Sequence, residues 1–149
     1  MEQLEKIIFV ARSGNVREAM AVGILNDLLA KEEVQVLARG LVVSFPEPMN
    51  GKAEAVLISN GITLENFVST QLANEEITEK TLVLTMERKQ REKVLTHYSN
   101  ATPENVQVLT DYVGDELEIL DPYGGSLQSY GLCYETLRKS IKKLVKILT

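Results

Sequence analysis

The fold follows from one stretch near the N-terminus, residues 7–21, which reads Ile7-Ile8-Phe9-Val10-Ala11-Arg12-Ser13-Gly14-Asn15-Val16-Arg17-Glu18-Ala19-Met20-Ala21. Residues 6–11 form a short apolar run, typical of a strand buried on both faces of a parallel sheet. A polar, glycine-containing stretch follows. Apolar residues then recur at helical spacing, at Met20, Ala21, Ile24, Leu25, Leu28 and Leu29. The stretch therefore predicts a strand, a turn and a helix in succession.

The alternation of strand and helix continues along the rest of the chain. Short apolar runs predict further strands at 34–37, 81–86 and 106–109. Helical spacing predicts helices at 49–57, at 87–98 and at 127–148, with loops at 39–48 and 111–125. Such alternation favours a parallel sheet with right-handed crossovers. We expect a single α/β domain over residues 1–149, with a four-stranded parallel sheet and helices on both faces.

The composition fits a globular domain and excludes several classes of function. The chain has 149 residues, with 16 Lys and Arg against 21 Asp and Glu, and a formal net charge of −5. An acidic chain is not expected to bind nucleic acid, which needs clustered basic residues. The single cysteine, Cys133, excludes an internal disulfide, and the single histidine, His97, argues against a zinc or iron site. We expect neither a metal nor a cofactor.

Two features of the sequence predict a cytoplasmic protein without a membrane partner. The longest apolar run, residues 7–11, is far shorter than the about 20 residues that span a bilayer. Residues 1–6 carry two glutamates and precede no long apolar segment, so they do not resemble a signal peptide.

The turn after the first strand is the first candidate site, because ligands of open α/β sheets bind at the carboxyl ends of the strands. Backbone N–H groups at the start of a helix carry partial positive charge and bind anions. Gly14 permits a positive φ in a loop that curls round an anion. Arg17 is placed to hold two oxygens of a phosphate. The pattern predicts an oxyanion site, but a turn of this kind also occurs as a simple tight corner.

A second segment favours the oxyanion site over the simple tight corner. It reads Asp121-Pro122-Tyr123-Gly124-Gly125-Ser126-Leu127. Together with residues 7–21 it resembles the two signatures of the low molecular weight protein tyrosine phosphatases, a Cys-x5-Arg loop after the first strand and a D-P-[YF]-G motif near the C-terminus. The resemblance extends over essentially the whole chain. It implies hydrolysis of protein phosphotyrosine without a metal or cofactor.

The resemblance assigns roles to residues of this sequence. Asp121 falls on the general acid, Tyr123 on a residue that lines the mouth of the site, and Ala11 on the nucleophile. In the family, backbone amides and the loop arginine hold the phosphoryl oxygens. The phosphate-binding loop would here consist of Arg12, Ser13, Gly14, Asn15, Val16 and Arg17.

The chain departs from the family where the chemistry takes place. Ala11 has no thiol to attack phosphorus. Val16 replaces a second loop cysteine, and Glu18 stands where the family has a serine that donates to the thiolate. A laboratory substitution would have left these supporting residues intact, so we expect a natural, degenerate member, a pseudophosphatase. Cys133 is expected to be a helix residue beside an apolar stripe, not a displaced nucleophile.

Three functional hypotheses follow. The first is a catalytically inactive family member that still binds phosphate, another oxyanion or a phosphotyrosine protein at residues 12–17. The alternative is a structural or partner-binding domain whose loop is closed by Glu18, which lies in the positive field of the helix N-terminus. The third and weakest is residual phosphatase activity through water activated by Asp121.

Overall fold

A computed structural model describes residues 3–29 and 34–149, so residues 1–2 and 30–33 of the expected 1–149 domain lie outside the described residues. Four parallel strands form one sheet in the order β2-β1-β3-β4. Their bounds are β1 Lys6–Ala11, β2 Gln35–Gly40, β3 Thr81–Thr85 and β4 Val106–Val108. In the register, Ile8 lies between Leu37 of β2 and Val83 of β3. The predicted single α/β domain with a four-stranded parallel sheet is confirmed.

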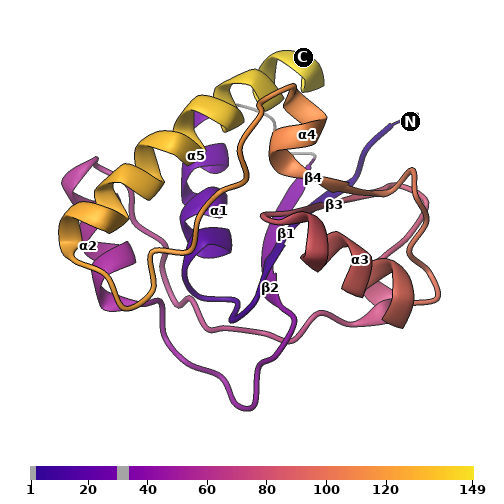
Figure 1. The fold of residues 1–149 in the computed structure, drawn as a ribbon, viewed down its shortest axis with the longest axis horizontal. Helices are drawn as coiled ribbons and strands as arrows, with labels where there is room; N and C mark the ends of the chain where they lie inside the picture. Colours follow the sequence, from indigo (N-terminus) through magenta and orange to yellow (C-terminus); the bar gives the residue numbers. More distant parts are fainter. Residues whose placement is uncertain (1–2, 30–33) are drawn as a thin grey trace.

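Helices cover both faces of the sheet, as predicted (Figure 1). Ile7 and Phe9 of β1 pack in a core with residues of α1, α2 and α5, whereas Ile8 and Val10 point to a second core that includes Val94 of α3. The helices are α1 Arg17–Leu28, α2 Gly51–Ser59, α3 Arg88–His97, α4 Leu109–Val113 and α5 Leu127–Leu148, with a short 3-10 helix at Asn74–Glu76. The strict alternation of β1 side chains between two cores explains its unbroken apolar run.

Helix α1 is buried on nearly every side because it lies between the sheet and α5. Every residue from Arg17 to Leu25 is buried. Gly23 lets α2 approach, since a Cβ there would lie 3.0 Å from side-chain atoms of Leu57 and Ile62. A helix enclosed in this way places its N-terminus, at Arg17 and Glu18, in the interior of the protein.

Helix α5 spans the predicted range and covers α1. Its N-cap is Ser126, whose side chain accepts a hydrogen bond from the backbone N–H of Ser129. The apolar stripe expected from the sequence is buried at Tyr130, Tyr134, Leu137, Ile141 and Leu144. No helix within the described residues is long and apolar enough to cross a membrane.

Two predicted loops contain regular structure instead. Strand β2 runs on to Gly40, because Arg39 pairs with Val10 in the ladder, so the predicted loop at 39–48 begins too early. Residues 109–113 form the short helix α4, and its last three residues, 111–113, fall in the expected loop at 111–125. Buried Leu109 anchors this turn, and Gly114 ends it with a φ of 84°.

Candidate functional site

The turn between β1 and α1 has the geometry that the sequence predicts. Ala11 ends a buried strand, Arg17 begins the helix, and Gly14 adopts a φ of +85°. The end of β2 presses against this turn, since a Cβ on Gly40 would lie 2.7 Å from the Gly14 nitrogen. Glycine at both positions therefore lets two backbones meet closely at the carboxyl edge of the sheet.

The carboxylate of Glu18 fills the inside of the turn. One oxygen, Oε2, accepts the N–H of Gly14 at 2.9 Å, and the other, Oε1, accepts the N–H of Val16 at 3.0 Å. The side chain is 0% exposed. Backbone donors thus converge on one point, as predicted, but the group that they bind belongs to the chain itself.

The groups around Glu18 shift its pKa in opposite directions. Burial raises the pKa of Glu18 above its ordinary value of 4.5, while the loop N–H groups and the charge of Arg17 lower it. Burial is the largest of these effects, so the net direction is upward. Folding therefore favours the protonated form of this carboxyl.

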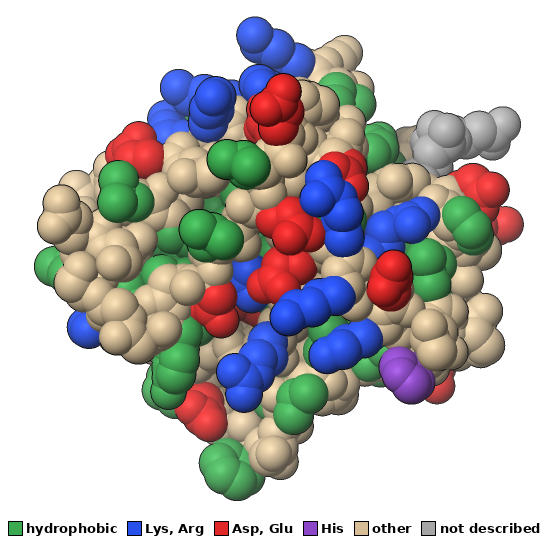
Figure 2. Space-filling model, in the orientation of Figure 1, with side chains coloured by type: hydrophobic (Ala, Val, Ile, Leu, Met, Phe, Trp, Pro, Cys, Tyr) green, Lys and Arg blue, Asp and Glu red, His purple; other side chains and the backbone are tan. Residues whose placement is uncertain are grey.

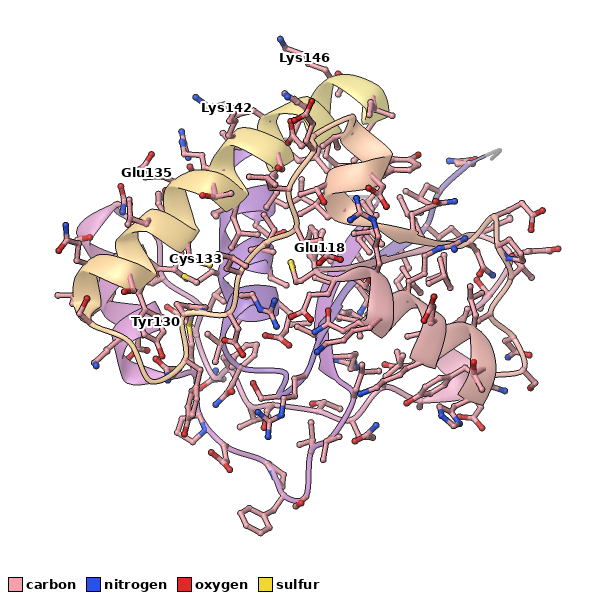
Figure 3. All side chains as sticks on the ribbon, viewed as in Figure 1. Glu118, Tyr130, Cys133, Glu135, Lys142 and Lys146 are labelled. Atoms are coloured by element: carbon pink, nitrogen blue, oxygen red, sulfur yellow. The ribbon has the colours of Figure 1, made fainter. Side chains whose placement is uncertain are left out.

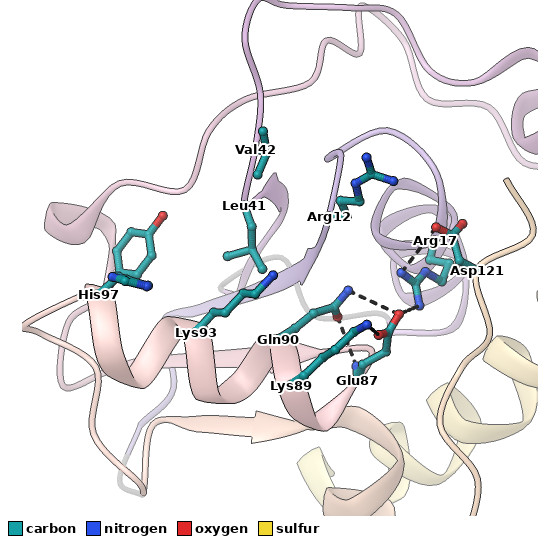
Figure 4. A pocket seen from close by; sticks show the side chains of 11 residues that line it. Arg12, Arg17, Leu41, Val42, Glu87, Lys89, Gln90, Lys93, His97 and Asp121 are labelled. Atoms are coloured by element: carbon teal, nitrogen blue, oxygen red, sulfur yellow. Dashed lines mark hydrogen bonds and ion pairs between the residues drawn. The ribbon is translucent and has the colours of Figure 1, made fainter.

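The guanidinium of Arg17 is bound by groups of the protein. Its Nη1 donates to Glu87 Oε2 and to the carbonyl of Ile119, both at 2.7 Å, and its Nη2 lies 3.8 Å from Asp121 Oδ2 (Figure 4). The side chain is only 2% exposed. The predicted phosphate-binding arginine thus joins α1 to the residue before α3 and to the segment between α4 and α5.

Arg17 also links the turn to the motif near the C-terminus, because its Nη2 lies 3.8 Å from Asp121 Oδ2. Asp121, the expected general acid, accepts the backbone N–H of Tyr123 at its Oδ1 atom, with a distance of 3.0 Å. This bond closes an Asx turn of the kind that Asp-Pro sequences favour. Tyr123 is 70% exposed and lines a different hollow, beside Leu120 and Leu132, instead of the space at Arg17.

The remaining residues of the turn serve different purposes. Arg12 is exposed, whereas Ala11 and Val16 are buried in the main core. Asn15 connects the turn to the loop before α2, because its Nδ2 donates to the carbonyl of Pro48 at 3.0 Å. Ser13 is half-buried.

Sequence reasoning missed Glu87 and the carbonyl of Ile119, the two partners of Arg17. Glu87 follows β3, and the carboxyl ends of neighbouring parallel strands meet at one edge. Its position after a strand was therefore an available signal. A backbone carbonyl carries no such signal, because every residue has one.

Cys133 lies on α5 (Figure 3), closer to the site than its position in the sequence suggests. The charges of Arg17, Asp121 and Glu18 all act on its thiol, and its Sγ is 3.8 Å from the carbonyl of Leu120. Burial raises the pKa of Cys133 to about 12. The thiol is therefore protonated at neutral pH and is a poor nucleophile.

A cavity of about 710 Å³ opens beside Arg17, between the turn, the end of β2 and α3 (Figure 4). Basic residues line much of it, and we call it the basic pocket: Arg12, Arg17, Lys89, Lys93 and His97, with Leu41, Val42, Glu87, Gln90, Tyr98 and Asp121. Within residues 3–29 and 34–149, no group of three or more acidic, histidine or cysteine side chains is arranged to hold a metal ion.

Comparison with known proteins assigns the family. The sequence model described as "Low molecular weight phosphotyrosine protein phosphatase" matches residues 6–149. The chain is 31% identical to the protein-arginine-phosphatase of Bacillus subtilis, over 95% of each chain. It is 26% identical to the low molecular weight protein-tyrosine-phosphatase PtpB of Staphylococcus haemolyticus, over 93% of this chain and 96% of that one.

The fold agrees with this assignment. The YwlE arginine phosphatase from Geobacillus stearothermophilus superposes with a TM-score of 0.87 at 27% identity, covering 97% of this chain and 92% of that one. The chain belongs to the low molecular weight protein tyrosine phosphatase family.

Proposed function

We propose that this chain is a non-catalytic member of its family, in which the carboxylate of Glu18 occupies the loop in place of a phosphoryl group. The observation that carries the proposal is the pair of hydrogen bonds from Gly14 and Val16 to the two Glu18 oxygens. In the family, loop amides bind phosphoryl oxygens. Here two of these amides already donate to the carboxyl oxygens of Glu18.

The absence of a nucleophile supports the proposal. Ala11 offers a buried methyl group at the position of the attacking thiolate. Cys133 lies within the influence of the same charges, but burial keeps its thiol protonated. Covalent phosphoryl transfer therefore lacks its first step.

The electrostatics of the loop also oppose a phosphate ion. A phosphate that entered would have to displace Glu18 from its N–H donors or approach a buried carboxylate. Arg17 cannot fully compensate, since Glu87 already holds its Nη1 at 2.7 Å. Of the two non-catalytic hypotheses, this geometry favours a partner-binding domain with a closed loop over a domain that binds phosphate in the loop. We propose a regulatory or binding role of this kind in the cytoplasm.

A turnover assay tests the proposal. An aryl phosphate, a phosphotyrosine peptide and a phosphoarginine peptide should all remain unhydrolysed, with the Bacillus subtilis protein-arginine-phosphatase as the positive control. Turnover at about 1 s⁻¹ or faster, within the usual range of enzymes, that is lost in Asp121→Ala would overturn the proposal. The loss in that variant separates true activity from a contaminating phosphatase.

A further inference from the structure

The basic pocket holds cations that the rest of the protein does not neutralise. Within the described parts of the chain, the side chains of Arg12 and Lys93 make no hydrogen bond or ion pair, and the side chain of Lys89 has only Glu87 Oε1, at 3.9 Å. The other oxygen of Glu87 is bound to Arg17. The chain has a net charge of −5, yet Figure 2 shows several basic side chains close together at the centre of this face, with acidic side chains among them.

Two of the cations lie in a line along α3. Lys89 and Lys93 are four residues apart, so they lie along the same side of the helix, and the ring of His97 follows one step further. At a rise of about 1.5 Å per residue, each step is about 6 Å. Arg12 stands across the pocket from this line (Figure 4). A single phosphate ion needs donors that converge on one point, and these charges form a row.

The spacing matches an extended peptide. Alternate side chains of a β-strand lie on one side and are about 6.6 Å apart, which is close to the step between the cations of α3. Lysine is a flexible point charge that pairs with a carboxylate without demanding a fixed orientation. Leu41, Val42 and Tyr98 add an apolar wall, and Val42 is 67% exposed.

We infer that the basic pocket binds an acidic peptide segment of a partner protein, extended along α3, with carboxylates at alternate positions. Its carboxylates pair with Lys89, Lys93 and Arg12, and the apolar wall receives uncharged residues between them. This inference rests on the proposed closed loop, which leaves the flanking cations as the anion-binding groups of this face.

Fluorescence anisotropy with a labelled peptide tests this inference. The probe is a peptide of about nine residues in which glutamate alternates with valine, enough to span the row at about 3.3 Å per residue. The double variant Lys89→Glu/Lys93→Glu should bind it about tenfold more weakly, since it removes two charge pairs and places two glutamates that repel the carboxylates of the probe. The matched control, Lys142→Glu/Lys146→Glu, changes the same charges on exposed positions of α5 and should bind like the wild type (Figure 3).

Several results would overturn the inference. Equal losses in the two double variants would show that only the net charge matters. Equal binding of a peptide with glutamine in place of glutamate would exclude charge recognition. Tighter binding of inorganic phosphate or of a single-stranded oligonucleotide would point to a different ligand class. Turnover of an aryl phosphate would instead contradict the proposed function and leave the peptide measurements as they stand.

Discussion

Replacing Glu18 by serine should open the loop to oxyanions. Serine is too short to reach the N–H groups of Gly14 and Val16, which lie 2.9 and 3.0 Å from the native carboxylate oxygens. The substitution also removes the negative charge that an incoming anion would meet. The freed donors would then face the same space at the positive end of α1.

The magnitude follows from the two lost bonds. A buried donor without a partner costs about 1–3 kcal/mol, so the loss of two partners in Glu18→Ser should lower the free energy of unfolding by about 2–6 kcal/mol. A bound oxyanion would accept both N–H groups again. At about 1.5 kcal/mol for each bond to a charged acceptor, vanadate should bind the variant about 100-fold more tightly than the wild type.

Isothermal titration with vanadate and thermal unfolding with added phosphate would measure these effects. The variant should melt below the wild type and recover stability as phosphate is added, because a ligand that binds only the folded state stabilises it. The matched control is Glu135→Ser, which removes an exposed glutamate of α5. Vanadate affinity that is equal in wild type and Glu18→Ser would refute the reasoning that Glu18 competes for the loop.

Three further changes probe the same site. Ala11→Cys should not produce measurable hydrolysis of an aryl phosphate, because Glu18 holds the amides that a phosphoryl group needs; turnover in this single variant would contradict that occupancy. Arg17→Met should lower the free energy of unfolding, measured in urea, by about 3 kcal/mol, since Glu87 loses its buried partner; a loss below about 1 kcal/mol would show that the ion pair contributes little. The pKa of Glu18 is raised on folding, so its contribution to stability is fully present below the unfolded value of 4.5 and is lost as the pH rises through the folded value. The free energy of unfolding of the wild type minus that of Glu18→Gln, measured by urea titration, should therefore fall as the pH rises above 4.5. A difference that grows with pH would contradict the upward shift of the Glu18 pKa.

Hydrophobic periodicity predicted those strands and helices whose pattern of buried side chains is regular. Strand β1 is apolar along its whole length because it faces two cores, and α5 carries a clear stripe because only one side is covered. Helix α4 escaped prediction, since five residues are too few for a helical period to appear. The predicted strand ended too early because the two prolines of residues 39–48 indicated a loop from Arg39 onward, whereas Arg39 belongs to β2 and its Nε donates to Glu76 Oε1 at 2.7 Å.

The candidate site was predictable where residues are neighbours in sequence. Gly14 follows from the need for a positive φ, and the placement of Glu18 within the loop follows from its position at the start of α1. The direction in which Arg17 points was not predictable, because its partners come from distant segments and one of them is a backbone carbonyl.

The contacts of Arg17 bear on how quickly the protein unfolds. They join residues 70 and 102 positions apart along the chain, at Glu87 and Ile119. Contacts across such long separations close only after the intervening chain has ordered, so we expect them to form after the folding transition state. Interactions that are absent from the transition state slow unfolding and leave the folding rate almost unchanged. Arg17, which the resemblance to the family places in phosphate binding, would here lower the rate of unfolding.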